Sequence, residues 1–326
     1  MIRRPPRSTP LYSSAASDVY KRQVKYDLDL FDDPYGKVEY ASYVGLKEHR
    51  QVARDAVRKS MVLLKNNSKV LPVAKDETIY VVGSGANNLG MQNGGWTVEW
   101  QGKMRPDFII LDENSDGQVR LAELTRFYQS IYDSKYNAGG AEGNFKSIDK
   151  DSNGTLTLDE FNQFKVSAPF QPAGTSVLDA IKEAIGNTGS VIYAPRAKNL
   201  GSNSLVLAVV GEYPYAEGYG DNPDISLSPF DIAVLERCYQ SGNKIAVIIF
   251  SGRPLIIKNH IDKWDALVAA WLPGMAGEGI ADVLFGDYAP TGKLSFSWPK
   301  DILQLPLNFG ESNYDPLFPF GFGLTY

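Results

Sequence analysis

Short apolar runs alternate with helix-like patterns along most of the chain, and this alternation restricts the folds open to it. The apolar runs lie at 79–83, 190–194, 205–210, 245–250, 266–272 and 293–298. Patterns typical of helices separate them, at 177–185, 230–239 and 277–285. Strands that are apolar on both faces and alternate with helices are what a parallel sheet covered on both sides requires. We therefore predict an α/β fold, a doubly wound and mostly parallel layer sandwich.

Polar and glycine-rich segments follow the carboxyl ends of the predicted strands. They span 83–102, 211–222, 251–254 and 273–279. Open α/β sheets bind their ligands at this edge. We expect the functional residues to lie in these loops.

Size and charge exclude several classes of protein. The 326 residues suffice for about two domains, and 33 basic against 38 acidic residues give no indication of a nucleic-acid partner. No apolar run approaches the roughly 18 residues that span a membrane. The single cysteine, Cys238, lies in a helix-like pattern and is interpreted as a buried, unreactive thiol.

The first 23 residues do not match the rest of the chain. They are basic and rich in proline and serine, and they lack the apolar core of a signal peptide. A transit peptide is one interpretation. We favour a non-native leader, similar to a translated sequencing adapter, and on that interpretation the true N-terminus lies outside this sequence.

An internal repeat interrupts the α/β pattern at 103–167. The run 108–123 aligns with the run 145–160, and each copy contains an acidic, glycine-centred loop. Long insertions in surface loops cost little closure entropy, so such a block is tolerated inside a sandwich.

Each copy has oxygen-bearing residues where a twelve-residue EF-hand loop has its calcium ligands, and glycine at the sharp turn. The matching residues are Asp112, Asn114, Asp116, Gln118 (through its backbone) and Glu123 in the first copy, and Asp149, Asp151, Asn153, Thr155 (backbone) and Glu160 in the second. This part resembles an EF-hand pair, which implies two Ca²⁺ sites; the alternative is two acidic loops that mimic the pattern.

Four further positions refine this prediction. Val119 and Leu156 lie where paired loops form a short two-stranded contact. Arg120 places a cation near the first site and should weaken it, and Pro106 should shorten the first incoming helix.

The loop 211–222 contains carboxyl groups suited to glycoside chemistry. Cleaving a glycosidic bond needs an acid for the leaving oxygen and a second carboxyl group on the opposite face of the sugar. Glu212 follows its strand directly and is expected to accept bonds from neighbouring backbone amides. Glu217 lies further out among three tyrosines (Tyr213, Tyr215 and Tyr219), a setting that favours the protonated form of a general acid. The alternative is a solvated loop carboxylate.

Trp96 and Trp100 follow two glycines in the loop 83–102. Tryptophans are commonly core residues, but their place at the predicted ligand edge favours stacking on the apolar face of a sugar ring.

Several runs resemble glycoside hydrolase family 3, and its exo-β-glucanase and β-glucosidase branch in particular. They lie at 54–65, 88–102, 210–217, 271–274, 283–287 and 317–326. The resemblance covers 24–102 and 168–326. It implies the end of a barrel domain, a linker and a helix at 24–75, a six-stranded sandwich at 76–102 and 168–326, and the EF-hand pair as an insertion at 103–167.

The resemblance also implies roles for residues. The family's acid/base glutamate corresponds to Glu217, and a tryptophan at the position of Trp100 stacks on the sugar of the leaving group, with Trp96 nearby. The nucleophilic aspartate belongs to a preceding barrel domain, of which 24–35 resembles only the end.

The implied function is that of the C-terminal part of a retaining β-glucosidase or exo-β-glucanase, acting on β-glucans or β-gluco-oligosaccharides. The chain is expected to need the barrel for activity, and its parent to be secreted or periplasmic.

Two other hypotheses stay open. The chain is alternatively a non-catalytic calcium-binding module on an α/β scaffold. The other hypothesis combines the glycoside hydrolase and calcium-binding interpretations: calcium stiffens the insertion and thereby positions Trp100.

Overall fold

The computed structural model describes residues 19–104, 106–132, 138–167 and 174–326. Residues 1–18 of the predicted leader therefore lie outside the described residues, as do 133–137 within the predicted insertion and 168–173 after it. The chain divides into two compact units, Met1–Arg50 and Gln51–Tyr326. The first contains a helical stretch at 19–27 and the 3-10 helix η1, Val38–Tyr43.

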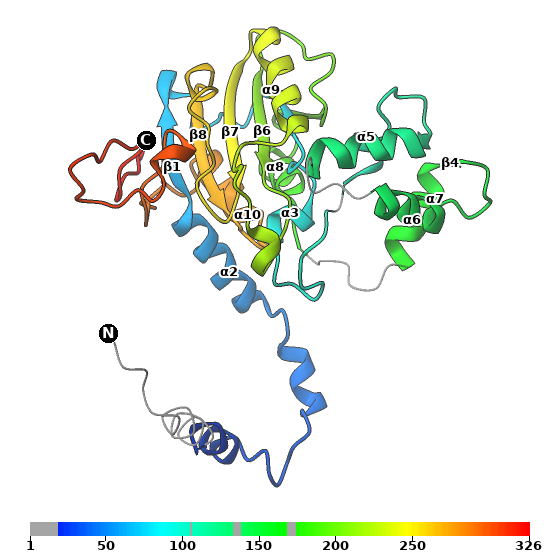
Figure 1. The fold of residues 1–326 in the computed structure, drawn as a ribbon, viewed down its shortest axis with the longest axis vertical. Helices are drawn as coiled ribbons and strands as arrows, with labels where there is room; N and C mark the ends of the chain where they lie inside the picture. The colour runs from blue at the N-terminus through cyan, green and yellow to red at the C-terminus, as the bar shows by residue number, and fades with distance from the viewer. Residues whose placement is uncertain (1–18, 105, 133–137, 168–173) are drawn as a thin grey trace, which may run out of the picture. The chain divides into compact units, whose positions relative to one another are not determined.

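A six-stranded sheet forms the centre of the second unit, in the order β1-β8-β7-β6-β2-β5 (Figure 1). The strands are β1 Val62–Asn66, β2 Thr78–Val82, β5 Ser190–Tyr193, β6 Leu205–Gly211, β7 Lys244–Phe250 and β8 Ala266–Trp271. Strand β1 runs antiparallel to β8, and every other pair is parallel. The predicted α/β sheet with mostly parallel strands is confirmed.

The central strands are buried on both faces. All seven residues of β6 are buried, and so are six of the seven in β7. Such strands need helices on both sides of the sheet, which explains their continuous valine, isoleucine and leucine content. No described helix is both long and apolar enough to cross a bilayer.

The predicted helices form after the strands as expected, the last of them after β8. They are α8 Val177–Ile185, α9 Pro229–Ser241 and α10 Glu278–Leu284, and a short helix α3, Leu89–Asn93, follows β2. Serine caps begin two of them: the Ser176 hydroxyl accepts from the Asp179 N–H, and the Ser228 hydroxyl accepts from the Asp231 N–H. The elements α2 Lys47–Ser60, η2 Asn67–Lys69, η5 Ile261–Lys263 and η6 Ile302–Gln304 complete the sandwich and its surroundings.

The strand order reverses between β2 and β6. From β2 the chain moves through α8 to β5 at one edge, whereas from β6 it moves through α9 to β7 in the opposite direction. Right-handed crossovers in opposite directions place α8 and α9 on opposite faces of the sheet. The loops after β2 and β6 therefore diverge at a topological switch point, which is where open α/β sheets bind ligands.

One predicted strand is wrong, and a different segment takes its place. The segment 293–298 is not a strand; Leu294 and Trp298 are buried, but Ser295 and Phe296 between them are exposed. This alternation suits a segment covered on one side only, and the Trp298 N–H bonds the Phe318 carbonyl at 2.8 Å. The sixth strand is β1, in which Val62, Leu63 and Leu64 are at most 2% exposed. The sheet thus begins before residue 76, the start predicted for the sandwich.

The described residues of 103–167 form a separate group of short helices beside α9 (Figure 1). The elements are α4 Phe108–Leu111, β3 Val119–Arg120, α5 Leu121–Tyr132, α6 Ala138–Ile148, β4 Thr155–Leu156 and α7 Leu158–Ser167. Helix α4 has only four residues, in agreement with the expected effect of Pro106.

Two sets of contacts hold this group together and attach it to the sandwich. Val119 pairs with Leu156 in the predicted two-stranded contact, and the Phe108 and Phe161 rings lie 5.8 Å apart. The Phe127 ring of α5 meets the Phe230 ring of α9 at 5.3 Å in an edge-to-face arrangement. The group is therefore packed on the sheet's covering layer.

Candidate active site

The loops after β2 and β6 form the candidate site, because they carry the predicted functional residues and lie at the switch point. They span 83–102 and 211–222. The first contains Trp96 and Trp100, and the second contains Glu217. The structure brings the two loops into direct contact.

A buried carboxylate holds the beginning of both loops. Asp231, in the first turn of α9, is 0% exposed. It accepts hydrogen bonds from the Ser84 N–H at 3.1 Å, the Ser84 hydroxyl at 2.8 Å and the Gly211 N–H at 3.2 Å. Burial raises the pKa of Asp231 to about 6, although these hydrogen bonds act in the opposite direction. One side chain thus connects the ends of β2 and β6.

Glu212 has a different partner from the one predicted. Its Oε1 accepts from Arg253 Nη2 at 2.7 Å and from Arg253 Nε at 2.9 Å, a two-pronged ion pair that is mostly buried. Its Oε2 accepts from the Tyr215 hydroxyl at 3.0 Å. The prediction that Glu212 bonds neighbouring backbone amides is therefore wrong: Arg253, in the loop after β7, reaches it instead. Glu212 is a positioning residue for the loop.

Close backbone contact joins the loop 83–102, the tryptophan loop, to the loop 211–222, the glutamate loop. A Cβ atom on Gly95 would lie 1.9 Å from the Tyr215 carbonyl oxygen, so only glycine fits there. The Gln101 Oε1 accepts from the Ala216 N–H at 2.8 Å. Ala216 directly precedes Glu217, and Gln101 directly follows Trp100. This hydrogen bond therefore fixes the two predicted site residues relative to one another through their neighbours.

The two tryptophans are surface residues and not part of the core. Trp96 is 66% exposed and Trp100 is 49% exposed. Their rings lie 6.3 Å apart, edge to face, and the Trp96 N–H bonds the Trp100 carbonyl at 2.8 Å. The backbone of Trp96 has a φ of 60°, which is uncommon for a bulky residue. An exposed ring pair at the ligand edge suits stacking on a sugar.

Glu217 begins the 3-10 helix η4, Glu217–Gly220, with a φ of 47° and an exposed side chain. The expected aromatic surroundings form only in part. Tyr215 donates its hydroxyl to Glu212, and the Tyr213 ring packs on the Tyr132 ring of α5 at 4.8 Å. Within the described chain, Glu217 is thus an accessible carboxyl group on a well-held loop.

The second acidic loop gathers carboxylates. Oxygens of Asp149, Asp151 and Glu160 all lie within 4.8 Å of one another. Backbone groups orient them: Asp149 accepts from the Gly154 N–H at 3.0 Å, and Glu160 from the Thr157 N–H at 2.9 Å. Convergent carboxylate oxygens are the donors that calcium prefers. This donor set fits a calcium ion, with Asn153 and the Thr155 carbonyl as the remaining predicted ligands.

The first acidic loop has the same backbone pattern but a competing cation. Asp112 accepts from the Gly117 N–H at 2.9 Å, as Asp149 does from Gly154. Arg120 Nη1, however, lies 2.6 Å from Asp116 and 3.8 Å from Glu123. Two predicted ligands of this loop therefore face a guanidinium group. The Asn114 Nδ2 also donates to Asp116, at 3.0 Å. The remaining predicted ligand of this loop is the backbone carbonyl of Gln118.

The comparison with protein families decides the membership of this chain. A family model described as the glycosyl hydrolase family 3 C-terminal domain matches residues 61–326. The chain belongs to glycoside hydrolase family 3. The matched range begins one residue before β1, in agreement with the position of that strand in the sheet.

Individual family 3 relatives agree with this assignment. The chain is 28% identical to a periplasmic beta-glucosidase of Salmonella typhimurium, over 93% of this chain and 39% of the relative. It is 27% identical to a beta-xylosidase of Formosa agariphila, over 93% of this chain and 37% of the relative. The crystal structure of an exo-1,3/1,4-beta-glucanase from a Pseudoalteromonas species matches with 32% identity and a TM-score of 0.64, over 88% of this chain and 29% of that one. The chain thus spans less than two-fifths of the length of these relatives.

Three residues of this candidate site were not singled out by the sequence analysis. Asp231 lies in an ordinary helix start, Arg253 in a loop far along the chain, and Gln101 beside a tryptophan. Each acts across the fold on a residue distant in sequence. A serine, proline and acidic residue at a helix start also predict a cap, so no local signal distinguishes Asp231 from a capping residue.

Proposed function

We propose that this chain is the acid/base-carrying part of a retaining β-glucosidase or exo-β-glucanase, which removes terminal β-D-glucosyl residues from glucans or oligosaccharides. The observation that carries the proposal is the joined pair of loops at the switch point, with Glu217 on one and Trp96 and Trp100 on the other. The relatives in the family include a beta-glucosidase, a beta-xylosidase and an exo-1,3/1,4-beta-glucanase.

The proposed chemistry assigns Glu217 two successive tasks. In a retaining glycosidase, one carboxyl group protonates the leaving oxygen while a nucleophile forms a glycosyl-enzyme intermediate, and the same group then takes a proton from the attacking water. An exposed carboxyl group on a constrained loop is accessible for both tasks. Its left-handed backbone conformation is the kind of outlier that motivates a functional hypothesis. Trp100 and Trp96 would hold the sugar of the leaving group.

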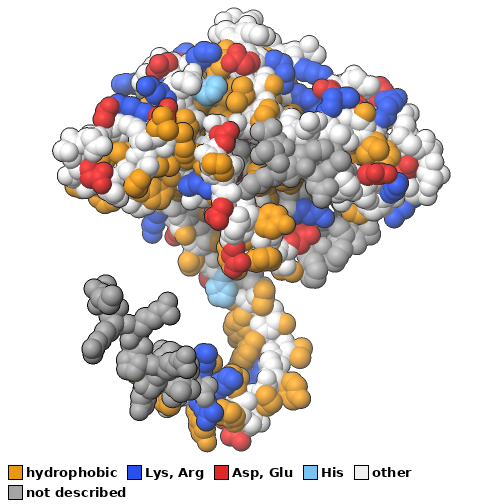
Figure 2. All heavy atoms as spheres, viewed as in Figure 1, with side chains coloured by type: hydrophobic (Ala, Val, Ile, Leu, Met, Phe, Trp, Pro, Cys, Tyr) orange, Lys and Arg blue, Asp and Glu red, His pale blue; other side chains and the backbone are white. Residues whose placement is uncertain are grey.

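The nucleophile is proposed to come from a preceding barrel domain, so that the chain by itself is inactive. Support comes from the greater length of the relatives and from the first unit. No described residue of 19–50 is buried, and Tyr26, Phe31 and Tyr35 are more than half exposed. Figure 2 shows hydrophobic side chains over much of the visible surface of this segment. Apolar surface of this kind is typical of a region that packs on another part of a larger protein.

Calcium binding is the second proposed function. The convergence of Asp149, Asp151 and Glu160 favours it, and the ion would be held at the second loop more tightly than at the first. When bound, the ion would supply positive charge that neutralises these neighbouring carboxylates. A non-catalytic calcium-binding module is the competing function for the whole chain.

A secreted or periplasmic parent is proposed from the relative in Salmonella, which is named as periplasmic.

The decisive test replaces Glu217 by glutamine in the full-length parent. General acid–base groups contribute about 10²- to 10⁴-fold to rate, so we expect a loss of this size in the hydrolysis of laminaribiose. A dinitrophenyl β-glucoside needs little protonation of its leaving group, and its glycosylation step should be affected far less.

Asp221→Asn is the matched control, because Asp221 lies in the same loop and also has an exposed carboxyl group. It should leave both rates nearly unchanged. Equal laminaribiose rates for Glu217→Gln and the wild type would exclude the catalytic proposal and favour the calcium-binding module.

A further inference from the structure

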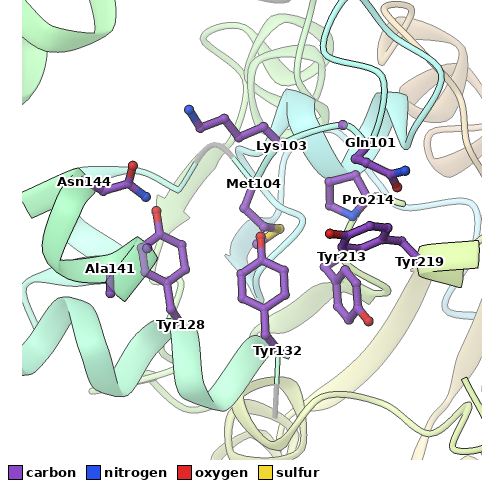
Figure 3. A pocket seen from close by; sticks show the side chains of 12 residues that line it. Gln101, Lys103, Met104, Tyr128, Tyr132, Ala141, Asn144, Tyr213, Pro214 and Tyr219 are labelled. Atoms are coloured by element: carbon purple, nitrogen blue, oxygen red, sulfur yellow. The ribbon is translucent and has the colours of Figure 1, made fainter. Parts of the chain in front are cut away.

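A cavity of about 290 Å³ lies between the insertion and the glutamate loop (Figure 3). Tyr128 and Tyr132 of α5 line it on one side, and Tyr213 and Tyr219 of the glutamate loop line it on the other. We propose that this cavity is a further sugar-binding subsite, which holds the part of a β-gluco-oligosaccharide that extends beyond the leaving-group sugar. The inference rests on the proposed glycosidase function and adds a preference for longer substrates.

Aromatic rings from two distant parts of the chain form the walls. The Tyr132 ring lies 4.8 Å from the Tyr213 ring, and the Tyr128 ring lies 5.9 Å from the Tyr132 ring. Tyrosine combines a flat apolar face with a hydroxyl group, which suits a ligand that has apolar C–H faces and polar edges. Burial raises the pKa of both Tyr132 and Tyr213, so these hydroxyls stay protonated at neutral pH.

A polar group of the lining has an unused donor. The Gln101 Oε1 is occupied by the Ala216 N–H, whereas its Nε2 is buried without a hydrogen-bond partner among the described residues. An unsatisfied buried donor is unfavourable, and a sugar hydroxyl is a suitable acceptor for it. Asn144 of α6 adds a second amide to the lining.

The charge of the lining favours a neutral ligand. Of the described residues that line the cavity, Lys103 alone is charged, and none is a carboxylate. A metal ion or a cationic ligand is therefore a poor match. A neutral, polyhydroxylated chain is a good one, since ligand sites combine apolar walls with a few polar groups.

Two residues of the cavity lining are neighbours in sequence of the proposed catalytic and stacking residues. Gln101 directly follows Trp100, and Tyr219 lies two residues after Glu217. A sugar chain stacked at Trp100 thus needs only to continue along the same loops to reach the tyrosines. Because α5 and α6 supply the other wall, the insertion would take part in substrate selection.

The test compares laminaritetraose with laminaribiose by calorimetric titration of the 326-residue chain. We expect the tetrasaccharide to bind about tenfold more tightly, which corresponds to roughly 1.4 kcal/mol. Gly140→Leu should abolish this advantage, because Gly140 lines the cavity and the leucine side chain would occupy it. An added Cβ at Gly140 meets nothing within 4 Å, and leucine is a better helix former than glycine, so the variant should fold.

Gly143→Leu is the matched control. Gly143 lies in the same helix, is exposed and has equal room for a Cβ, but it does not line the cavity. Equal affinity for the two sugars, or equal affinity of the Gly140→Leu and Gly143→Leu variants for the tetrasaccharide, would overturn the inference. Trp100→Ala, which should weaken both sugars, reports separately on the proposed leaving-group subsite, so the two proposals fail in distinguishable ways.

Discussion

The loops at the sheet edge and the acidic loops of the insertion are held by different kinds of contact. At the sheet edge, Asp231 and Arg253 reach residues that are far away in sequence. In the insertion, Asp112 and Asp149 accept hydrogen bonds from glycines only five residues further along. Local contacts make a loop recognisable from its sequence, whereas long-range contacts make it depend on the whole fold.

The largest expected effect is the loss of the buried carboxyl group at the sheet edge. Near pH 4.5 Asp231 is protonated, and its hydroxyl oxygen still accepts from the Gly211 N–H, whereas the amide nitrogen of Asn accepts no hydrogen bond, so a buried hydrogen bond is lost. We expect the free energy of unfolding to fall by about 2 kcal/mol near pH 4.5, measured by urea denaturation. Asp179→Asn is the control: Asp179 occupies the equivalent place after the Ser176 cap of α8 but is exposed.

This effect should depend on pH. The pKa of Asp231 is raised to about 6 in the native state from the ordinary aspartate value of 3.8, so the native state binds the proton more tightly than the unfolded state does. The resulting stability is fully present below the unfolded pKa and is lost as pH rises through 6, about 3 kcal/mol in total. The deficit of Asp231→Asn should therefore shrink between pH 4.5 and 7. A deficit that stays constant over this range would contradict the assignment.

An intermediate effect is expected at position 9 of the two acidic loops, which is Arg120 in one and Thr157 in the other. Arg120→Thr removes the cation that faces Asp116 and should raise the calcium affinity of the first loop about tenfold, roughly 1.4 kcal/mol. Thr157→Arg should lower that of the second loop by a similar factor. Calcium titration by calorimetry measures both, and no change in either variant would show that local charge does not set the difference.

The smallest expected effect connects the two regions. If calcium stiffens the insertion and thereby positions Trp100, added calcium should change the tryptophan emission. Trp264 and Trp298 are at most 1% exposed and should contribute little to the change. The change should disappear in Trp100→Phe and be reversed by a chelator. Emission that is indifferent to calcium would show that calcium does not position Trp100.

The elements with a strong local pattern were predictable. Helix α8 has the predicted bounds, 177–185, because its apolar spacing and its serine cap are both local. The strands β6 and β7 were evident from continuous apolar runs. The segment 293–298 was mistaken for the sixth strand because alternating apolar residues describe any segment covered on one side. The true strand β1 was missed because its short run directly follows α2.

The candidate site was predictable in its residue types but not in its connections. Glu217, Trp96 and Trp100 stood out because carboxyl and aromatic residues after buried strands have few structural explanations. The partner of Glu212 could not be foreseen, since Arg253 lies 41 residues away in sequence. Equally, nothing near Asp231 indicates that it bonds Ser84, 147 residues before it.

The sequence by itself determined the parallel α/β sheet, the helices between its strands and the two acidic loops, because hydrophobic period and turn chemistry act over a few residues. Only the tertiary structure decided which loops meet, which carboxylate is buried and which is accessible, and where the tyrosines of the insertion face the glutamate loop. Those properties arise when strands distant in sequence are aligned in one sheet, since burial and electrostatics depend on all neighbours in space.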